Sequence, residues 1–179
     1  MAKPHVLPLS EVYRVLEPGP VVLLTTAQRG RANVMTMSWH MMVDFTPPLV
    51  GCIVSSANHS FRALRATGEC VIAVPPVELA ETVVRVGNCS GRDTDKFATF
   101  GLTPLPAREV QAPLVAECFV NLECRVAETR LVNKFNLFVL EVVHAWRKPS
   151  RRAPKTIHHL GYGRFVVDGE TIALPSRMP

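Results

Sequence analysis

The sequence lacks the features of a membrane protein, a secreted protein or a disulfide-rich protein. No apolar run reaches the roughly 18 residues that a membrane-spanning helix needs. The first ten residues hold a lysine, a histidine and two prolines, and no apolar core of a signal peptide. The five cysteines are odd in number and form no C-x-x-C pair, which predicts reduced thiols. We therefore expect a cytoplasmic protein that does not enter a membrane.

The sequence also lacks the common signatures of hydrolytic, metal and nucleotide sites. Its six histidines show neither H-x-x-x-H nor H-E-x-x-H spacing, and the cysteines and histidines lack the spacing of zinc ligands. There is no G-x-S-x-G, no Walker loop and no complete dinucleotide fingerprint. His144 lies in an apolar segment, where a histidine is usually a core residue. No metal site and no catalytic dyad is expected.

What the chain does contain is the composition of a globular protein. Of its 179 residues, 47% are apolar and 20% are charged, which predicts a single domain over residues 1–179. The net charge of +5 suits anionic small molecules and, less specifically, nucleic acid. Residues 147–155 form a basic segment interrupted by prolines. We interpret it as a solvated loop, with a dinucleotide phosphate or a nucleic-acid backbone as alternative contacts.

Short apolar segments separated by turn residues predict a mainly β fold. A strand over 20–26 and a longer strand over 31–45 are expected to pair as a hairpin. Further strands are expected over 49–54, 70–74, 117–126, 137–146, 165–167 and 171–174, the last two joined by an Asp-Gly turn. Helices are expected after Ser10, between Ser60 and Gly68, and over 77–86. The pattern indicates a closed barrel capped by helices.

Two polar segments interrupt this pattern, and the first runs from Asn33 to His40. Alternation places Asn33, Met35, Met37 and Trp39 on one face and Val34, Thr36, Ser38 and His40 on the other. Hydrogen-bonding groups beside methionine and tryptophan suit a flat aromatic ligand that is both stacked and hydrogen-bonded. The alternative is an edge strand with one polar face.

The second polar segment, Ser55 to Ser60, precedes an expected helix. Unpaired backbone N–H groups and the helix dipole favour an anion at such a position, and serine and asparagine side chains add hydrogen bonds to a phosphate. Helix capping uses the same residue types and is the alternative. Because the two segments lie on consecutive strands, one can offer a surface for a ring and the other a site for a phosphate.

Several motifs in this chain share their order and spacing with one family. They are Asn33-x-Met35-Thr36-x-Ser38-Trp39, Pro47-Pro48-Leu49-Val50-Gly51, Asn58-x-Ser60 leading into Thr67-Gly68, Ser90-Gly91, and Asp95-Lys96-Phe97. Through them, residues 15 to 146 resemble the flavin reductase-like family, which includes the flavoredoxins. The resemblance implies an FMN-binding split β-barrel, a Greek-key barrel of about six strands with short capping helices. It also implies a homodimer with FMN at the subunit interface.

The resemblance implies a role for each polar segment. The isoalloxazine ring would be lined, partly through backbone atoms, by Asn33, Val34, Met35, Thr36, Met37, Ser38 and Trp39. The FMN phosphate would be held by Ser55, Ser56, Asn58 and Ser60, with Lys96 as a cation beside the phosphate or the ribityl chain. His159 and Tyr162 are candidates for contacts made by the other subunit.

The implied activity is that of a flavin reductase that uses NADH or NADPH and passes electrons through FMN to a free flavin, a ferric complex or a protein such as a monooxygenase. An FMN electron carrier that takes electrons from a protein is the alternative. From another class, a basic barrel that binds nucleic acid through residues 147–155 is the less favoured interpretation. Residues 69–74 depart from the family pattern, in which an aromatic residue and an asparagine precede the proline.

Overall fold

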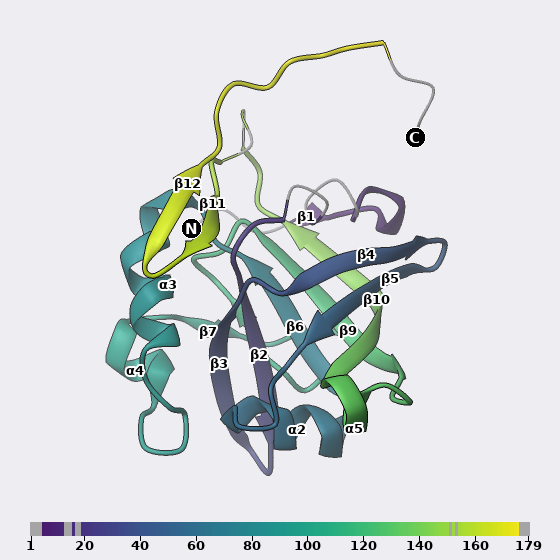
Figure 1. Cartoon of the computed structure of the whole chain (residues 1–179), viewed down its shortest axis with the longest axis vertical. Helices are drawn as coiled ribbons and strands as arrows, with labels where there is room; N and C mark the ends of the chain where they lie inside the picture. Colours follow the sequence, from purple (N-terminus) through teal and green to yellow (C-terminus); the bar gives the residue numbers. More distant parts are fainter. Residues whose placement is uncertain (1–4, 13–15, 17–18, 151, 153, 176–179) are drawn as a thin grey trace.

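The computed structural model describes residues 5–12, 16, 19–150, 152 and 154–175, and its central feature is a strongly curled antiparallel sheet (Figure 1). The sheet has eight strands: seven follow the order β3-β2-β6-β9-β10-β5-β4, and β1 pairs with β10. The strands are β1 (His5–Val6), β2 (Val22–Gln28), β3 (Arg31–Met37), β4 (His40–Phe45), β5 (Pro48–Ile53), β6 (Glu69–Val74), β7 (Pro104–Leu105), β8 (Leu114–Val115), β9 (Val120–Glu128), β10 (Leu137–Arg147), β11 (Ile157–Gly161) and β12 (Arg164–Val167). The mainly β split barrel is confirmed, with more strands than the six expected.

The barrel is split between β3 and β4, which follow each other in the chain but stand at opposite ends of the sheet. The expected single strand over 31–45 is therefore wrong, because the chain crosses from one end of the sheet to the other between Met37 and His40. His40 Nε2 bonds the carbonyl oxygen of Pro20 at 2.7 Å and holds the crossing in place. The alternation of side chains continues from β3 through the crossing into β4. It does not reveal that β3 pairs with β2 while β4 pairs with β5.

The barrel interior is apolar and contains three of the five cysteines. Cys52, Cys70 and Cys124 lie in the largest core cluster, and all five cysteines are unbridged. Burial, with a smaller contribution from Cys124, raises the pKa of the Cys52 thiol to about 12, so this thiol stays protonated and unreactive. Cys118 is also buried, whereas Cys89 is half-buried. That these thiols are reduced stays a prediction.

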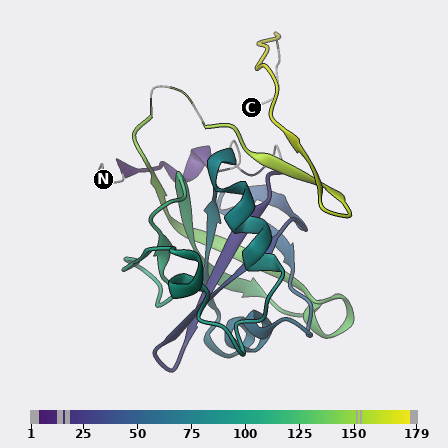
Figure 2. The same ribbon diagram turned by 90° about the vertical axis from the view of Figure 1, so that its left-hand side faces the viewer.

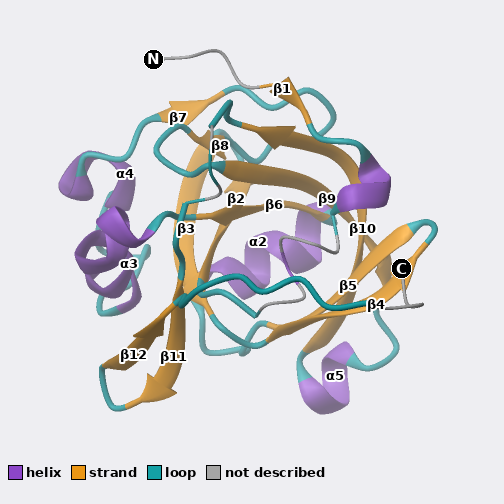
Figure 3. Ribbon diagram, turned by 90° about the horizontal axis from the view of Figure 1, so that it is seen from above, coloured by secondary structure: helices purple, strands orange, loops and turns teal. Residues whose placement is uncertain are grey.

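Helix α2 (His59–Thr67) closes one end of the barrel (Figure 3). Phe61 and Leu64 are three residues apart and pack on the same side of the helix into the interior core. Phe61 makes an edge contact with Phe138, with ring centroids 5.6 Å apart. The helix ends at Gly68, whose φ of 69° lies in the left-handed region, as expected of a C-terminal glycine.

A second layer covers the outer face of β2 and β3 (Figure 2). It consists of the 3-10 turn η2 (Val77–Leu79) and the helices α3 (Ala80–Gly87) and α4 (Lys96–Phe100). Val34 of β3 is buried against Val83 of α3, and the Thr36 hydroxyl donates to the Val83 carbonyl. The helix expected over 77–86 is confirmed as η2 and α3 together.

Strands β11 and β12 form a separate hairpin beside α3 (Figure 1). Its turn spans residues 161–163, whose φ angles of 94°, 51° and 71° are all positive. The hairpin expected at Asp168-Gly169 is wrong, since residues 171–174 form no strand. Instead, the Asp168 carboxylate accepts from the backbone N–H of Thr156 at 2.9 Å, so its side chain fixes the start of β11.

The remaining elements are short. Strand β7 pairs with β8, and two further helices are η1 (Leu9–Glu11) and α5 (Val132–Phe135). The 3-10 turn η1 forms the beginning of the helix expected after Ser10. The continuation of that expected helix, at residues 13–15 and 17–18, lies outside the described residues. In the part of the chain that is described, no helix is both long enough and apolar enough to cross a membrane.

Candidate functional site

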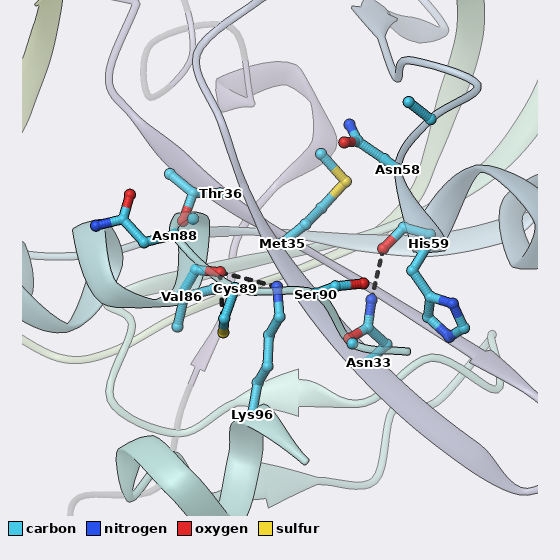
Figure 4. A pocket seen from close by; sticks show the side chains of 14 residues that line it. Asn33, Met35, Thr36, Asn58, His59, Val86, Asn88, Cys89, Ser90 and Lys96 are labelled. Carbon is cyan, nitrogen blue, oxygen red and sulfur yellow. Dashed lines mark hydrogen bonds between the residues drawn. The ribbon is translucent and has the colours of Figure 1, made fainter. Parts of the chain in front are cut away.

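A cavity of about 250 Å³ lies where β3, the N-terminus of α2 and the connection from α3 to α4 meet (Figure 4). This central cavity is lined by Asn33, Met35, Thr36, Ala57, Asn58, His59, Ser60, Val86, Gly87, Asn88, Cys89, Ser90, Gly91 and Lys96. Most of these side chains are polar, although the cavity adjoins two apolar core clusters. A concave wall with convergent polar groups is typical of a ligand site.

The open edge of β3 borders the central cavity. Among the described residues, β3 pairs with β2 on one side and with no strand on the other. Met35 and Thr36 point to opposite faces of the strand, yet both line the cavity, so the cavity lies against the strand edge. An edge strand leaves backbone N–H and C=O groups unpaired, and here they are available to a ligand.

Asn33 joins three parts of the cavity wall. Its side chain is 9% exposed, and Nδ2 donates to the Ser60 hydroxyl at 2.8 Å, which ties β3 to α2. The loop between α3 and α4 approaches from the other side: a Cβ placed on Gly91 would lie 1.9 Å from Asn33 Oδ1. Only glycine therefore lets this loop pack so closely against the strand.

The N-terminus of α2 borders the cavity without a side-chain cap. Asn58 occupies the N-cap position but makes no capping hydrogen bond, and its side chain lines the cavity instead (Figure 4). The Ser55 hydroxyl accepts from the backbone N–H of Ala57 at 3.3 Å, outside the cavity. Helix capping therefore does not explain why Asn58 and the buried Ser60 are polar. The helix dipole adds positive potential at this wall of the cavity.

Lys96 is a buried cation at the cavity. Asp95 caps α4 by accepting from the backbone N–H of Ala98 at 3.2 Å, which fixes Lys96 as the first helical residue. Lys96 is only 4% exposed, and its Nζ donates to the Val86 carbonyl at 2.8 Å (Figure 4). In the described residues it forms no ion pair. Burial lowers the pKa of Lys96, and Cys89 partly opposes this effect.

An ammonium group carries three donor hydrogens, and the Val86 carbonyl takes one of them. Burying a charge is costly unless it is paired and hydrogen-bonded. A buried ammonium with one protein acceptor and a cavity beside it is thus a favourable place for an anion. Ser60, Asn58 and Ser90 surround the same space and can donate further hydrogen bonds.

A second cavity, of about 280 Å³, continues from the central one toward the β11–β12 hairpin, and we call it the hairpin cavity. It shares Thr36, Gly87 and Asn88 with the central cavity, and Ser38 and His159 are among its other lining residues. His159 thus reaches this cavity within its own chain. Each cavity is smaller than the roughly 300–1,000 Å³ of usual ligand sites, but the two together fall in that range.

The structure gathers only some of the residues that the sequence indicated. Asn33, Met35, Thr36, Asn58, Ser60 and Lys96 line the central cavity, and Ser38 and His159 line the hairpin cavity. The side chains of Val34 and Met37 are buried in the core, so only their backbone can face a ligand. Trp39, Ser55, Ser56 and Tyr162 are exposed and line neither cavity.

Sequence reasoning gave no site role to eight residues that line the central cavity: Ala57, His59, Val86, Gly87, Asn88, Cys89, Ser90 and Gly91. Ser90-Gly91 did stand among the family motifs, and that was the available signal. Asn88 follows α3 directly, and its approach to β3 depends on how α3 packs, which no local pattern reveals. The described residues of the basic segment over 147–155 line neither of these two cavities, and residues 151 and 153 lie outside the described part of the chain.

These features define a split-barrel protein with a polar ligand site at the open edge of β3. The chain belongs to the family described as "Flavin reductase like domain", whose profile matches residues 14–165. The uncharacterized protein YddH of Escherichia coli (strain K12) is 32% identical in an alignment that covers 92% of this chain and 94% of that protein. An uncharacterized protein of Archaeoglobus fulgidus is 33% identical over 138 residues, which cover 75% and 77% of the two chains.

Solved structures share the fold. The FMN-binding domain of a flavin reductases-like enzyme from Shewanella baltica OS155 is 26% identical, with a TM-score of 0.89 over 97% of this chain and 98% of that chain. Flavoredoxin of Desulfovibrio vulgaris (Miyazaki F) is 24% identical, with a TM-score of 0.78 over 87% and 90%. Nitrilotriacetate monooxygenase component B from Bacillus cereus is 19% identical, with a TM-score of 0.72 over 87% and 86%. The last two similarities establish the fold alone.

Proposed function

We propose that this protein is an FMN-binding oxidoreductase of the flavin reductase type, with the flavin in the central and hairpin cavities. The observation that carries the proposal is the buried Lys96 ammonium, which forms no ion pair among the described residues and lies at a cavity lined by hydroxyl and amide groups. Membership in the family and the similarity to an FMN-binding domain support the same cofactor.

The α2 side of the central cavity fits the FMN phosphate. Lys96 would supply a positive charge, and Ser60 and Asn58 would donate hydrogen bonds at the start of the helix. Ser55 and Ser56 lie outside the cavity, so we assign them no direct contact through their side chains.

The other end of the site fits the isoalloxazine ring. The ring has a polar edge, which the unpaired backbone groups along β3 can bond, and flat faces, against which Met35 can pack. Thr36 cannot turn freely, because its hydroxyl donates to the Val83 carbonyl. Ser38, Asn88 and His159 would supply further polar contacts in the hairpin cavity.

Bound FMN supplies the capacity to accept a hydride and to pass electrons on. The residues of this chain bind the cofactor, orient it and exclude water from one side of it. We propose NADH or NADPH as the donor and a free flavin, a ferric complex or a protein such as a monooxygenase component as the acceptor. Hydride transfer between a nicotinamide and a flavin requires no protein acid or base, so we assign no residue of this chain to that role.

We further propose a homodimer with the flavin near its interface. Trp39, just before β4, and Met41 and Val43 within it alternate along the chain, and they are 69%, 56% and 49% exposed. A row of exposed apolar side chains on one face is typical of an interface, and Trp39 lies just beyond the β3 edge that borders the site. Met41→Lys should yield a monomer in light scattering. An unchanged dimer in Met41→Lys would contradict this interface.

The five unbridged cysteines support a reducing compartment, and we propose the cytoplasm.

The purified protein tests the function directly. A flavin absorption spectrum that is retained on gel filtration or restored by added FMN is expected. Anaerobic NADH or NADPH should then bleach the flavin band rapidly. Bleaching by neither nucleotide, with the flavin still bound, would instead favour an electron carrier that receives electrons from a protein. Failure to bind FMN at all would overturn the proposal. Salt-sensitive DNA binding without flavin binding would favour the basic-barrel alternative.

A further inference from the structure

The β11–β12 hairpin forms one wall of the hairpin cavity, although it lies outside the eight-stranded sheet (Figure 1). Its residues His159 and Phe165 line the cavity together with Thr36 of β3. Other residues of the hairpin face solvent: Leu160 is 59% exposed, and Tyr162 at the turn is fully exposed. A flavin ring in the hairpin cavity would therefore be covered on one side by this hairpin.

The hairpin is bonded to the rest of the fold only at its beginning. The backbone N–H of Val21, just before β2, donates to the Ile157 carbonyl at 2.8 Å, and Ile157 is buried in the outer core cluster. Among the described residues, no hydrogen bond joins residues 159–167 to another part of the chain, and Phe165 adds only an apolar contact. The first residues of the hairpin thus decide where the rest of it lies.

His158 connects this first part of the hairpin to two neighbours. Its Nε2 lies 2.5 Å from Asp168 Oδ1, and its Nδ1 lies 3.1 Å from the carbonyl oxygen of Gly19. A carboxylate and a carbonyl oxygen can only accept, so both ring nitrogens must donate, and only the protonated imidazole carries a hydrogen on each nitrogen. The geometry therefore describes a His158 imidazolium that is paired with Asp168 and bonded to the segment before β2.

Asp168 joins the two ends of the hairpin. Its carboxylate accepts from the backbone N–H of Thr156 at 2.9 Å and from the Thr156 hydroxyl at 3.0 Å, in addition to His158. Partial burial raises the pKa of Asp168, but the hydrogen bonds from Thr156 and His158 outweigh it and hold this pKa below its ordinary value. An isolated surface ion pair contributes little, whereas a carboxylate bonded by several donors is held in one place.

We propose that His158 and Asp168 are positioning residues for the reaction at the flavin: their ion pair latches the β11–β12 hairpin over the ring end of the site and so limits how closely a reductant or an acceptor approaches the ring. The inference rests on the proposed flavin site. Neither residue lines the central or the hairpin cavity, so both act through the hairpin and not by touching the flavin.

The test uses the full chain in five forms: the wild type, His158→Gln, Asp168→Asn, the double variant and Glu170→Gln. Glu170 is an exposed carboxylate near Asp168 that makes no hydrogen bond among the described residues, so it controls for loss of a charge. Amide exchange at Val21, followed by NMR in the flavin-free protein, reports the bond between the body and the hairpin. Amides of β9, in the middle of the sheet, serve as the internal reference.

Both single variants should exchange the Val21 amide about five- to tenfold faster than the wild type, while the β9 amides are unchanged. The double variant should be little faster than the faster single variant, because the two residues form one contact. FMN affinity should change less than about twofold, since the contacts to the phosphate are untouched. Glu170→Gln should behave as the wild type.

The second measurement is the rate at which dithionite, an anionic reductant that needs no binding site, reduces the bound FMN in a stopped-flow experiment. An opened hairpin should raise this rate at least about threefold in both single variants. A purely electrostatic effect would have opposite signs, because His158→Gln removes a positive charge and Asp168→Asn removes a negative one. The two variants together therefore separate the position of the hairpin from its charge.

Three results would overturn the latch or its role. Unchanged exchange at Val21 would show that the pair does not hold the hairpin. Faster exchange with an unchanged dithionite rate would show that the hairpin does not cover the flavin, and rate changes of opposite sign would assign the effect to charge alone. Failure of the wild type to bind FMN would reject the proposed function, and the exchange measurement, which needs no flavin, would still decide whether the latch exists.

Discussion

Two charged side chains, Glu123 and Lys96, are almost fully buried, and their surroundings differ sharply. The Glu123 carboxylate on β9 accepts from the backbone N–H groups of residues 108, 109 and 110 and from Trp146 Nε1, at 2.6 to 3.2 Å. Lys96 donates to a single carbonyl oxygen and borders the central cavity. A buried charge that the protein satisfies completely serves the fold, whereas one that it satisfies in part indicates a place for a ligand.

The largest effect is expected at Glu123. Glu123→Ala removes the buried acceptor of four partly buried hydrogen bonds, so the free energy of unfolding should fall by at least about 3 kcal/mol. Urea denaturation measures the change, and Glu170→Ala, at an exposed position, serves as the control. A loss below about 1 kcal/mol would show that the network around Glu123 does not hold the loop over 106–113.

Lys96→Met should produce the opposite pattern. The stability of the flavin-free protein should change by less than about 1 kcal/mol, since a poorly compensated buried charge disappears together with one hydrogen bond. FMN affinity should fall about ten- to a hundredfold, because a charge-assisted contact to the phosphate is lost. Lys134→Met, on the exposed helix α5, is the control. A large loss of stability with unchanged FMN affinity would assign Lys96 to the fold.

Gly91→Ala should distort the wall of the central cavity where the α3–α4 loop packs against Asn33. The added methyl group would lie 1.9 Å from Asn33 Oδ1, so the loop or the Asn33–Ser60 hydrogen bond must shift. We expect a loss of roughly 1–3 kcal/mol in stability, as for other overpacked sites, together with weaker FMN binding. Gly169→Ala, where a Cβ meets no atom within 4 Å, should leave both measurements unchanged. Wild-type FMN affinity in Gly91→Ala would place the flavin elsewhere.

The smallest effect is a pH dependence at His40, which is bonded at one ring nitrogen only. Its Nε2 bonds the Pro20 carbonyl, while Nδ1 is buried and has no partner among the described residues. Burial lowers the pKa of His40, and the hydrogen bond to Pro20 partly opposes this effect. The unfolded chain therefore binds the proton more readily, and stability should fall as the pH drops below about 6.5. His40→Gln should flatten this part of the stability curve, whereas exposed His5→Gln should not; a slope that persists in His40→Gln would assign the effect to another group.

The sequence could predict the helices and strands of this fold better than the way in which the strands pair with one another. The apolar strands, α2 with its terminal Gly68 and the end of α3 all follow from local patterns. The break between β3 and β4 does not, because the alternation continues through it and only tertiary pairing separates the two strands. Likewise Asp168-Gly169 has the composition of a hairpin turn, but the Asp168 carboxylate is used to anchor β11 instead.

The site was predictable where its residues belong to one strand or one helix start. Asn33, Thr36 and Ser60 follow from two polar segments, of which one lies on β3 and the other leads into α2. That Lys96 is buried at the cavity depends on the docking of α4, which local patterns do not specify. The burial of Glu123 likewise depends on the preceding loop, whose backbone N–H groups at residues 108–110 fold back onto its carboxylate, and no local pattern reveals this contact.

The most direct test of the central claim is the preference for FMN over riboflavin, since the two ligands differ only in the phosphate. The wild type should bind FMN at least about tenfold more tightly than riboflavin. The double variant Ser60→Ala/Lys96→Ala should lose most of that preference while its affinity for riboflavin changes little. Equal affinities in the wild type, or a preference that survives intact in the double variant, would contradict a phosphate site at Lys96 and Ser60.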